Sequence, residues 1–110
     1  MLIGEYITKL SGLTQYSPIF GRGGQAANFS VDVLDVPGGG VTLATTVEHK
    51  NSDDTTWTTL ATFAAIGGTT GVKVIDAAGI KEQLRFTFTV AGGNASSTFY
   101  INVLAPQWMP

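Results

Sequence analysis

The sequence contains no cysteine, one histidine and few charged residues. Without cysteine, a disulfide framework, thiolate chemistry and a zinc ribbon are excluded. Charged residues make up 13% of the chain, about half of the ~25% that is usual in globular domains. The six lysines and arginines are scattered, and the net charge is −2. Because a nucleic-acid binder needs a basic stripe, we expect no nucleic-acid partner.

Long hydrophobic runs are also missing. No apolar run approaches the ~18 to 20 residues that cross a bilayer as a helix, so we expect no membrane partner. The N-terminal Met1–Glu5 has neither a basic start nor a long apolar stretch, so we expect no secretory signal and a cytoplasmic site of synthesis. A chain of 110 residues has room for one core, and we expect one domain.

In place of charge the chain carries fifteen threonines and fourteen glycines, and its dominant hydrophobic period is two. Such alternation of apolar and polar residues is typical of half-buried strands. Five segments show it: Phe29–Val33, Val41–Glu48, Trp57–Phe63, Gln83–Val90 and Phe99–Val103. Weaker strands are predicted at Val72–Ile75 and Tyr6–Leu10, and a bulge at Val36, where the alternation changes phase.

Turn residues separate these segments at intervals of about 10 to 20 residues, which is typical of all-β sandwiches and barrels. They lie at Pro37–Gly40, Asn51–Asp54, Gly67–Gly68 and Gly92–Asn94. We therefore predict an all-β fold, an antiparallel β-sandwich that is jelly-roll-like or immunoglobulin-like (Ig-like), with about six to eight strands. One short helical turn is predicted at Asp76–Gln83, with Asp76 as its cap.

The parity of the strands predicts which side chains form the core: Trp57, Phe63, Phe86, Phe88, Phe99 and Ile101. The two ends lack this periodicity. We expect the sandwich to span residues 25–105, with an irregular, extended N-terminal arm at 1–24 and a C-terminal tail at 106–110.

Few residues are candidates for chemistry. His49 shares the apolar face with Val47 beside a turn, which favours a strand-end histidine satisfied by the backbone over a general base. The oxygen-rich Asn51–Asp54 lacks the closing glutamate of an EF-hand calcium loop and is interpreted as a turn. Gly21–Gly24 resembles a phosphate loop only in its glycine content. We expect no enzymatic activity, no cofactor and no metal.

The stretch Thr45–Phe63 is the most distinctive part of the sequence. It has a strand ending in Val-Glu-His, a polar Asp turn, and a tryptophan followed by a threonine-rich strand. It resembles a hairpin of small β-domains in tailed-bacteriophage particles, and Leu84-Arg85-Phe86 with the late Pro-Gln-Trp is similar to such proteins too. The resemblance implies a virion structural protein at the capsid surface: a capsid decoration (cement) protein, or a head or tail accessory subunit.

By the same resemblance, the partners are a second copy of the chain, in a homo-oligomer that is a trimer by analogy, and a major capsid or other virion protein. We expect the contacts at residues 1–24 and 105–110. The candidate contact residues are Tyr6, Tyr16, Phe20, Arg22, Trp108 and Met109. Trp108 is the favoured interface anchor. In the competing arrangement, Pro106 turns the chain and Trp108 closes one end of the sandwich.

A second function stays open from the sequence. A carbohydrate-binding β-sandwich module, used for adsorption or glycan recognition, presents aromatic rings on an exposed face or loop. The aromatics whose position or parity permits exposure are Tyr6, Tyr16, Tyr100 and Trp108.

Overall fold

The computed structural model describes residues 2–8, 14–37, 40–92 and 98–109, and the rest of the chain lies outside the description. The described residues contain ten strands and no helix. In chain order the strands are β1 (Leu2–Thr8), β2 (Thr14–Tyr16), β3 (Phe20–Gly21), β4 (Ala26–Asp35), β5 (Thr42–Lys50), β6 (Thr58–Thr62), β7 (Gly71–Ala78), β8 (Gln83–Ala91), β9 (Phe99–Leu104) and β10 (Gln107–Met109). Parts of the predicted Tyr6–Leu10 strand and of the turns Pro37–Gly40 and Gly92–Asn94 fall outside the described residues.

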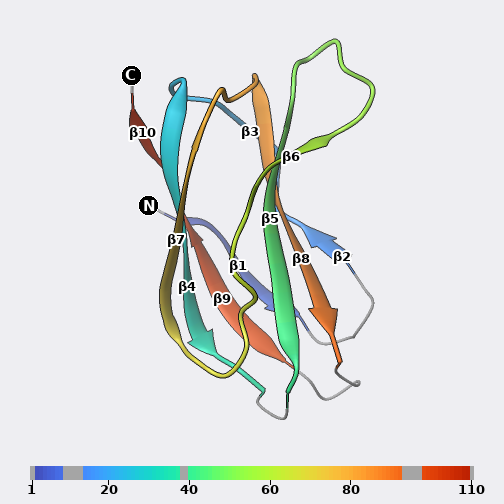
Figure 1. Ribbon diagram of the computed structural model, residues 1–110, viewed down its shortest axis with the longest axis vertical. Coiled ribbons are helices and arrows are strands. Elements are labelled where there is room, and N and C mark those ends of the chain that lie inside the picture. The colour runs from blue at the N-terminus through green and yellow to red at the C-terminus, as the bar shows by residue number, and fades with distance from the viewer. Residues whose placement is uncertain (1, 9–13, 38–39, 93–97, 110) are drawn as a thin grey trace.

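Two antiparallel five-stranded sheets face each other as a sandwich, which confirms the predicted fold class (Figure 1). The first sheet has the order β1-β9-β4-β10, and β7 pairs with the other edge of β4. The second has the order β2-β8-β5-β6, and β3 also pairs with β8. The strand number exceeds the predicted six to eight because both ends of the chain join the sheets.

The core lies between the sheets and is built from the alternate, inward-facing residues of β4, β5, β8 and β9. Phe86 is fully buried at its centre. Its ring centroid lies 6.0 to 6.4 Å from those of Phe20, Phe29, Phe63 and Phe88. The remaining predicted core residues, Phe99 and Ile101, are also fully buried. Five of the six predicted core positions are therefore confirmed.

Trp57 is the sixth, and its placement in the core is wrong. In the β5–β6 ladder Val47 pairs with Ala61, but Glu48 pairs with Thr59, which leaves Leu60 as a bulge residue. An extra residue in one strand reverses the side-chain parity beyond it. Trp57 is consequently turned to the outer face of the second sheet, where it is half-buried against charged side chains.

The predicted helical turn at Asp76–Gln83 is also wrong. Strand β7 continues to Ala78, which pairs with Ala26 of β4. Asp76 lies within this strand and does not cap a helix. Its Oδ1 accepts a hydrogen bond from the side-chain amide of Asn28 (2.6 Å) on the outer face of the sheet. Gly79 then takes a positive φ of 70°, a conformation that glycine adopts at little cost, and ends the strand.

The N-terminal region differs from the predicted irregular arm. Strand β1 pairs with β9, from Leu2 opposite Leu104 to Thr8 opposite Phe99. Strands β2 and β3 pair with β8 of the other sheet. These pairings satisfy backbone groups at the edges of β8 and β9 that would otherwise be unpaired. Strands β2 and β3 have three and two residues, and the seven residues of β1 do not alternate between apolar and polar, which explains why the sequence predicted an arm.

The C-terminal tail also joins a sheet. β9 pairs with β4 up to Val31 opposite Val103, and β10 continues along the same edge, with Trp108 opposite Ala27. The two strands are thus one interrupted strand, and the break contains Pro106, which has no N–H to give to a ladder. The bulge predicted near Val36 is present as a register shift between β4 and β9 at 33–35.

Candidate functional site

The outer face of the second sheet carries a cluster of one arginine and two aromatic residues. Arg85 of β8 lies between the buried Leu84 and Phe86, so strand alternation directs its side chain away from the core. Its guanidinium carbon lies 4.1 Å from the ring centroid of Tyr16 and 4.5 Å from that of Trp57. Tyr16, Arg85 and Trp57 are called the Arg85 stack below. Each cation–π contact contributes about 0.5–1 kcal/mol at an exposed site.

Two further charges flank the Arg85 stack. Glu48 stands directly opposite Arg85 in the β5–β8 ladder, and Arg85 Nε donates to Glu48 Oε1 at 2.8 Å. Lys50 Nζ lies 5.4 Å from the centroid of the Trp57 ring. Two cations and one carboxylate leave this area with one net positive charge. In a chain of net charge −2, this is a local reversal of sign.

Threonines surround the Arg85 stack on the same face. The hydroxyls of Thr14 and Thr89 are hydrogen-bonded across β2 and β8 (2.8 Å), and those of Thr46 and Thr87 across β5 and β8. Hydroxyls that bond to each other hold the strands together and present methyl groups and oxygens to the outside. The face carries no pocket among the described residues. It is a surface suited to contact with another surface.

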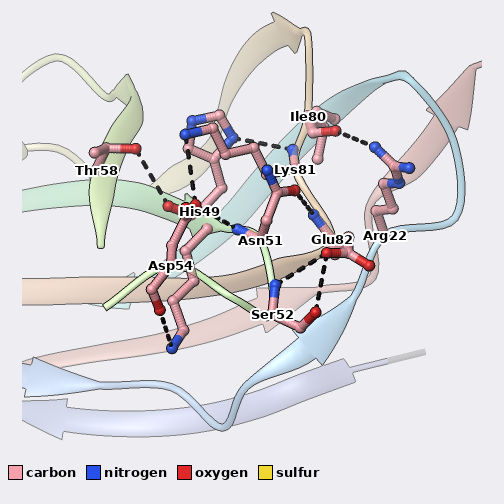
Figure 2. Close-up of polar contacts among 10 residues, drawn as sticks. Arg22, His49, Asn51, Ser52, Asp54, Thr58, Ile80, Lys81 and Glu82 are labelled. Carbon is pink, nitrogen blue, oxygen red and sulfur yellow. Dashed lines mark hydrogen bonds and ion pairs between the residues drawn. The ribbon is translucent and has the colours of Figure 1, made fainter. Parts of the chain in front are cut away.

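A second polar cluster closes one end of the sandwich by joining the 51–54 turn to the 79–82 turn (Figure 2). Asn51 N–H donates to Asp54 Oδ2 (2.8 Å), and Asp54 N–H to the Asn51 carbonyl (3.0 Å). Ser52 donates to Glu82 Oε1 through its N–H (2.9 Å) and its hydroxyl (3.2 Å). Lys81 Nζ lies 3.7 Å from Asp54 Oδ2. The carboxylates thus bind the chain's own donors, which supports the turn interpretation over the calcium loop.

His49 is buried beneath this end cluster. Its Nδ1 accepts a hydrogen bond from the backbone N–H of Lys81 at 3.2 Å, and its carbonyl oxygen accepts one from the Thr58 hydroxyl at 3.3 Å (Figure 2). The prediction of a strand-end histidine satisfied by the backbone is therefore confirmed. Burial lowers the pKa of His49 below its ordinary value of 6.5; the positive charge of Lys81 lowers it further, and Asp54 opposes the shift.

This environment predicts a pH dependence of stability. A protonated Nδ1 has no lone pair for the Lys81 N–H, so folding favours neutral His49. The unfolded chain takes up the proton first as pH falls through 6.5. The contribution of neutral His49 to the free energy of unfolding is therefore fully present above this pH. It is lost as the pH falls from 6.5 toward the lower pKa that His49 has in the folded protein. The denaturant midpoints at pH 8 and pH 5 should differ more for wild type than for His49→Asn. The asparagine retains a hydrogen-bond acceptor but does not titrate. If the difference between the two midpoints were the same in both proteins, the assignment to His49 would be contradicted.

The six predicted contact residues lie in different environments. Tyr6 is in β1 opposite Ile101, and Tyr16, which is 51% exposed, belongs to the Arg85 stack. Phe20 is partly buried and stacks on Phe86. The remaining three lie at the same end of the sandwich as the 51–54 and 79–82 turns. Arg22 Nη1 donates to the Ile80 carbonyl (2.7 Å). Met109 is 41% exposed, and Trp108 packs onto the core.

Trp108 packs on the core of its own chain, as the competing arrangement predicts, and its role as an interface anchor stays a prediction. Its ring makes an edge contact with Phe29, with centroids 6.2 Å apart. It also lies directly on Gly23, because a Cβ placed at that glycine would be 2.7 Å from Trp108 Cδ1. Gly23 and Gly24 are therefore the two glycines over which β10 passes closely.

Sequence reasoning missed Arg85, Glu48, Lys50 and Trp57 as parts of one site. The alternation in β8 already places Arg85 outside the core, and Glu48 and Lys50 have the same outward parity in β5. What joins them is the bulge in β6, which brings Trp57 to the same face. No pattern in the sequence marks that bulge.

Comparisons with known proteins do not identify the chain. A scan against family models, a search of curated proteins and a search of solved structures each found no match. In the described part of the chain, no group of three or more His, Cys, Asp or Glu side chains is placed to hold a metal ion, and no helix is long and apolar enough to cross a membrane.

Proposed function

We propose that this protein is a non-enzymatic structural subunit of a bacteriophage particle that decorates and stabilises the capsid by docking through the outer face of its second sheet. The observation that supports the proposal is the Arg85 stack. Tyrosine, tryptophan and arginine are the residues most enriched among energetically dominant positions of protein interfaces. Here all three stand in contact on one pocket-free face, bordered by threonines.

The resemblance to phage β-domains and the Arg85 stack meet in the same segment. The hairpin 45–63 that carries the resemblance supplies Glu48, Lys50 and Trp57, which are three of the five side chains in and around the stack. The remaining two, Tyr16 and Arg85, come from neighbouring strands of the same sheet. The part of the chain that resembles a virion protein is thus also the part that builds the candidate contact surface.

The proposal includes self-association on the particle, with a trimer as the expected state by analogy. Strand β7 supports a contact between copies, because it forms an edge of the first sheet and presents two large apolar side chains to solvent. These are Val72, which is 56% exposed, and Val74, which is 54% exposed. Exposed apolar edge strands favour pairing with another chain. Sedimentation of the purified protein measures its oligomeric state, and a monomer at all concentrations would contradict this part.

Mass spectrometry of purified particles of the phage that encodes this chain tests the function directly. We expect the chain in the particles, at a copy number in fixed proportion to the major capsid protein. Particles from which the gene has been deleted should lose integrity at a lower temperature than complete particles. If the chain is expressed in infected cells but absent from purified particles, the proposal is wrong.

The exposure of Tyr16 supports a second candidate, a carbohydrate-binding module. A ring that is 51% exposed beside the half-buried Trp57 offers a stacking surface for a sugar. Because Trp57 lies at the proposed site, its fluorescence should change in a saturable manner when host-cell oligosaccharides are added. A saturable change together with absence of the chain from particles would favour the carbohydrate module; no change would remove that candidate.

A further inference from the structure

We infer that the Arg85 stack is a preorganised site for a carboxylate, and that its occupant is an aspartate or glutamate side chain on the virion protein to which this chain docks. The inference rests on the proposed function and adds the chemistry of the contact. It assigns the central hydrogen bonds of the interface to the Nη groups of Arg85, with Tyr16 and Trp57 as the residues that position them.

The donors of Arg85 are only partly used within the chain. A guanidinium group has five N–H donors, and Nε–H is bonded to Glu48. Among the described residues, no hydrogen-bond acceptor is found for the Nη groups. The side chain is 21% exposed and its Nη atoms are not fully buried, so these donors remain open to an acceptor on a partner.

The two aromatic rings restrict the position of the guanidinium group. Tyr16 belongs to β2 and Trp57 immediately precedes β6, and these strands lie on opposite sides of β8 in the sheet. The rings therefore approach Arg85 from opposite sides, at 4.1 and 4.5 Å. An arginine that is already immobilised loses little side-chain entropy when it binds, so more of the contact energy appears as affinity.

Shape and charge favour a carboxylate as the ligand. A carboxylate is planar and accepts two parallel hydrogen bonds in the plane of the guanidinium. The proposed partner is a protein surface, whose anionic side chains are carboxylates, so the ligand is an aspartate or a glutamate. The local net charge of one positive unit from Arg85, Lys50 and Glu48 also favours an acidic partner surface.

The main test measures binding of the full chain to phage particles that lack it, by co-sedimentation. Wild type should bind saturably. Arg85→Gln removes the charge and the donors and should weaken binding by at least about 30-fold, the lower end for truncating one partner of an interfacial charge pair. Arg85→Lys keeps the charge and should still weaken binding about tenfold, because a lysine cannot form the in-plane pair.

Lys81→Gln is the matched control, since it removes one positive charge from outside both the Arg85 stack and strand β7; Lys81 Nζ lies 3.7 Å from Asp54 Oδ2. It should bind like wild type. Circular dichroism and the melting temperature establish that each variant is folded. If wild type does not bind, the proposed function is wrong. If wild type binds and folded Arg85→Lys binds equally well, the function stands and the carboxylate site is wrong.

The second measurement distinguishes the ligand chemistry on the free protein. Sodium acetate should shift the side-chain NMR signals of Arg85 in a saturable manner, beyond the shift caused by sodium chloride at equal ionic strength. Sodium phosphate should cause a smaller shift than acetate. A larger response to phosphate, or the same response to acetate and chloride, would overturn the assignment of a carboxylate.

Discussion

Phe86→Ala should lower the free energy of unfolding by about 3–5 kcal/mol, the range for truncating a fully buried phenylalanine. Phe86 is fully buried and contacts four other phenylalanine rings from both sheets, so the change leaves a cavity where the sheets meet. A small domain has only ~5–15 kcal/mol of stability in total. The variant should therefore unfold at a much lower urea concentration than wild type.

The matched control is Ile19→Ala, between β2 and β3. Ile19 is 59% exposed, and such surface changes usually stay within about 0.5 kcal/mol. Its urea midpoint should equal that of wild type. If Phe86→Ala shared that midpoint, the inward face of β8 would be wrongly assigned, and with it the outward direction of Arg85, since the two are neighbours in one strand.

The strands that could be predicted from the sequence are those with one fully buried face. In β8 and β9 every second residue is buried, so hydrophobic alternation alone defines both the strand and its inner face. The predicted core residues of these strands, such as Phe88 and Ile101, are confirmed. The edge strand β7 was predicted as Val72–Ile75 and extends to Ala78, because the backbone ladder with β4 continues after the apolar alternation has ended.

The candidate site was harder to predict because it depends on register. Trp57 follows the apolar parity of Phe63 in the sequence, and only the bulge at Leu60 separates the two onto opposite faces. A bulge is set by pairing with β5, which is a long-range contact, and leaves no mark on local alternation. The aromatic partner of Arg85 on the other side, Tyr16, comes from a three-residue strand that is too short to show a period.

The role of two glycines also could not be predicted from the sequence. Gly23 and Gly24 belong to the glycine-rich stretch 21–24, and in the structure they allow the C-terminal strand to approach. A Cβ at Gly24 would lie 2.5 Å from the Met109 carbonyl oxygen, and one at Gly23 would lie against the Trp108 ring. The need for glycine is therefore created by residues more than eighty positions away along the chain. A single sequence cannot distinguish such a requirement from local flexibility.

Trp108→Ala should lower the free energy of unfolding of the monomer by about 2–3 kcal/mol, below the range for a fully buried tryptophan because this one is half-buried. Its ring covers Phe29 and fills the space over Gly23. Deleting Gln107–Pro110 should cost at least as much, since the ladder with Ala26–Asn28 is lost as well. Met109→Ala, at a side chain that is 41% exposed, is the control and should leave the melting temperature nearly unchanged.

A double-mutant cycle separates this packing from a general effect of changing the C-terminus. In wild type, Gly23→Ala should destabilise the protein strongly, because the new Cβ would lie 2.7 Å from Trp108 Cδ1. In the Trp108→Ala background the same methyl group has free space, so the cost of Gly23→Ala should nearly disappear. Additive losses would show that Trp108 does not lie on Gly23. A Trp108→Ala variant that keeps the wild-type melting temperature yet no longer assembles would instead return this tryptophan to the role of an interface anchor.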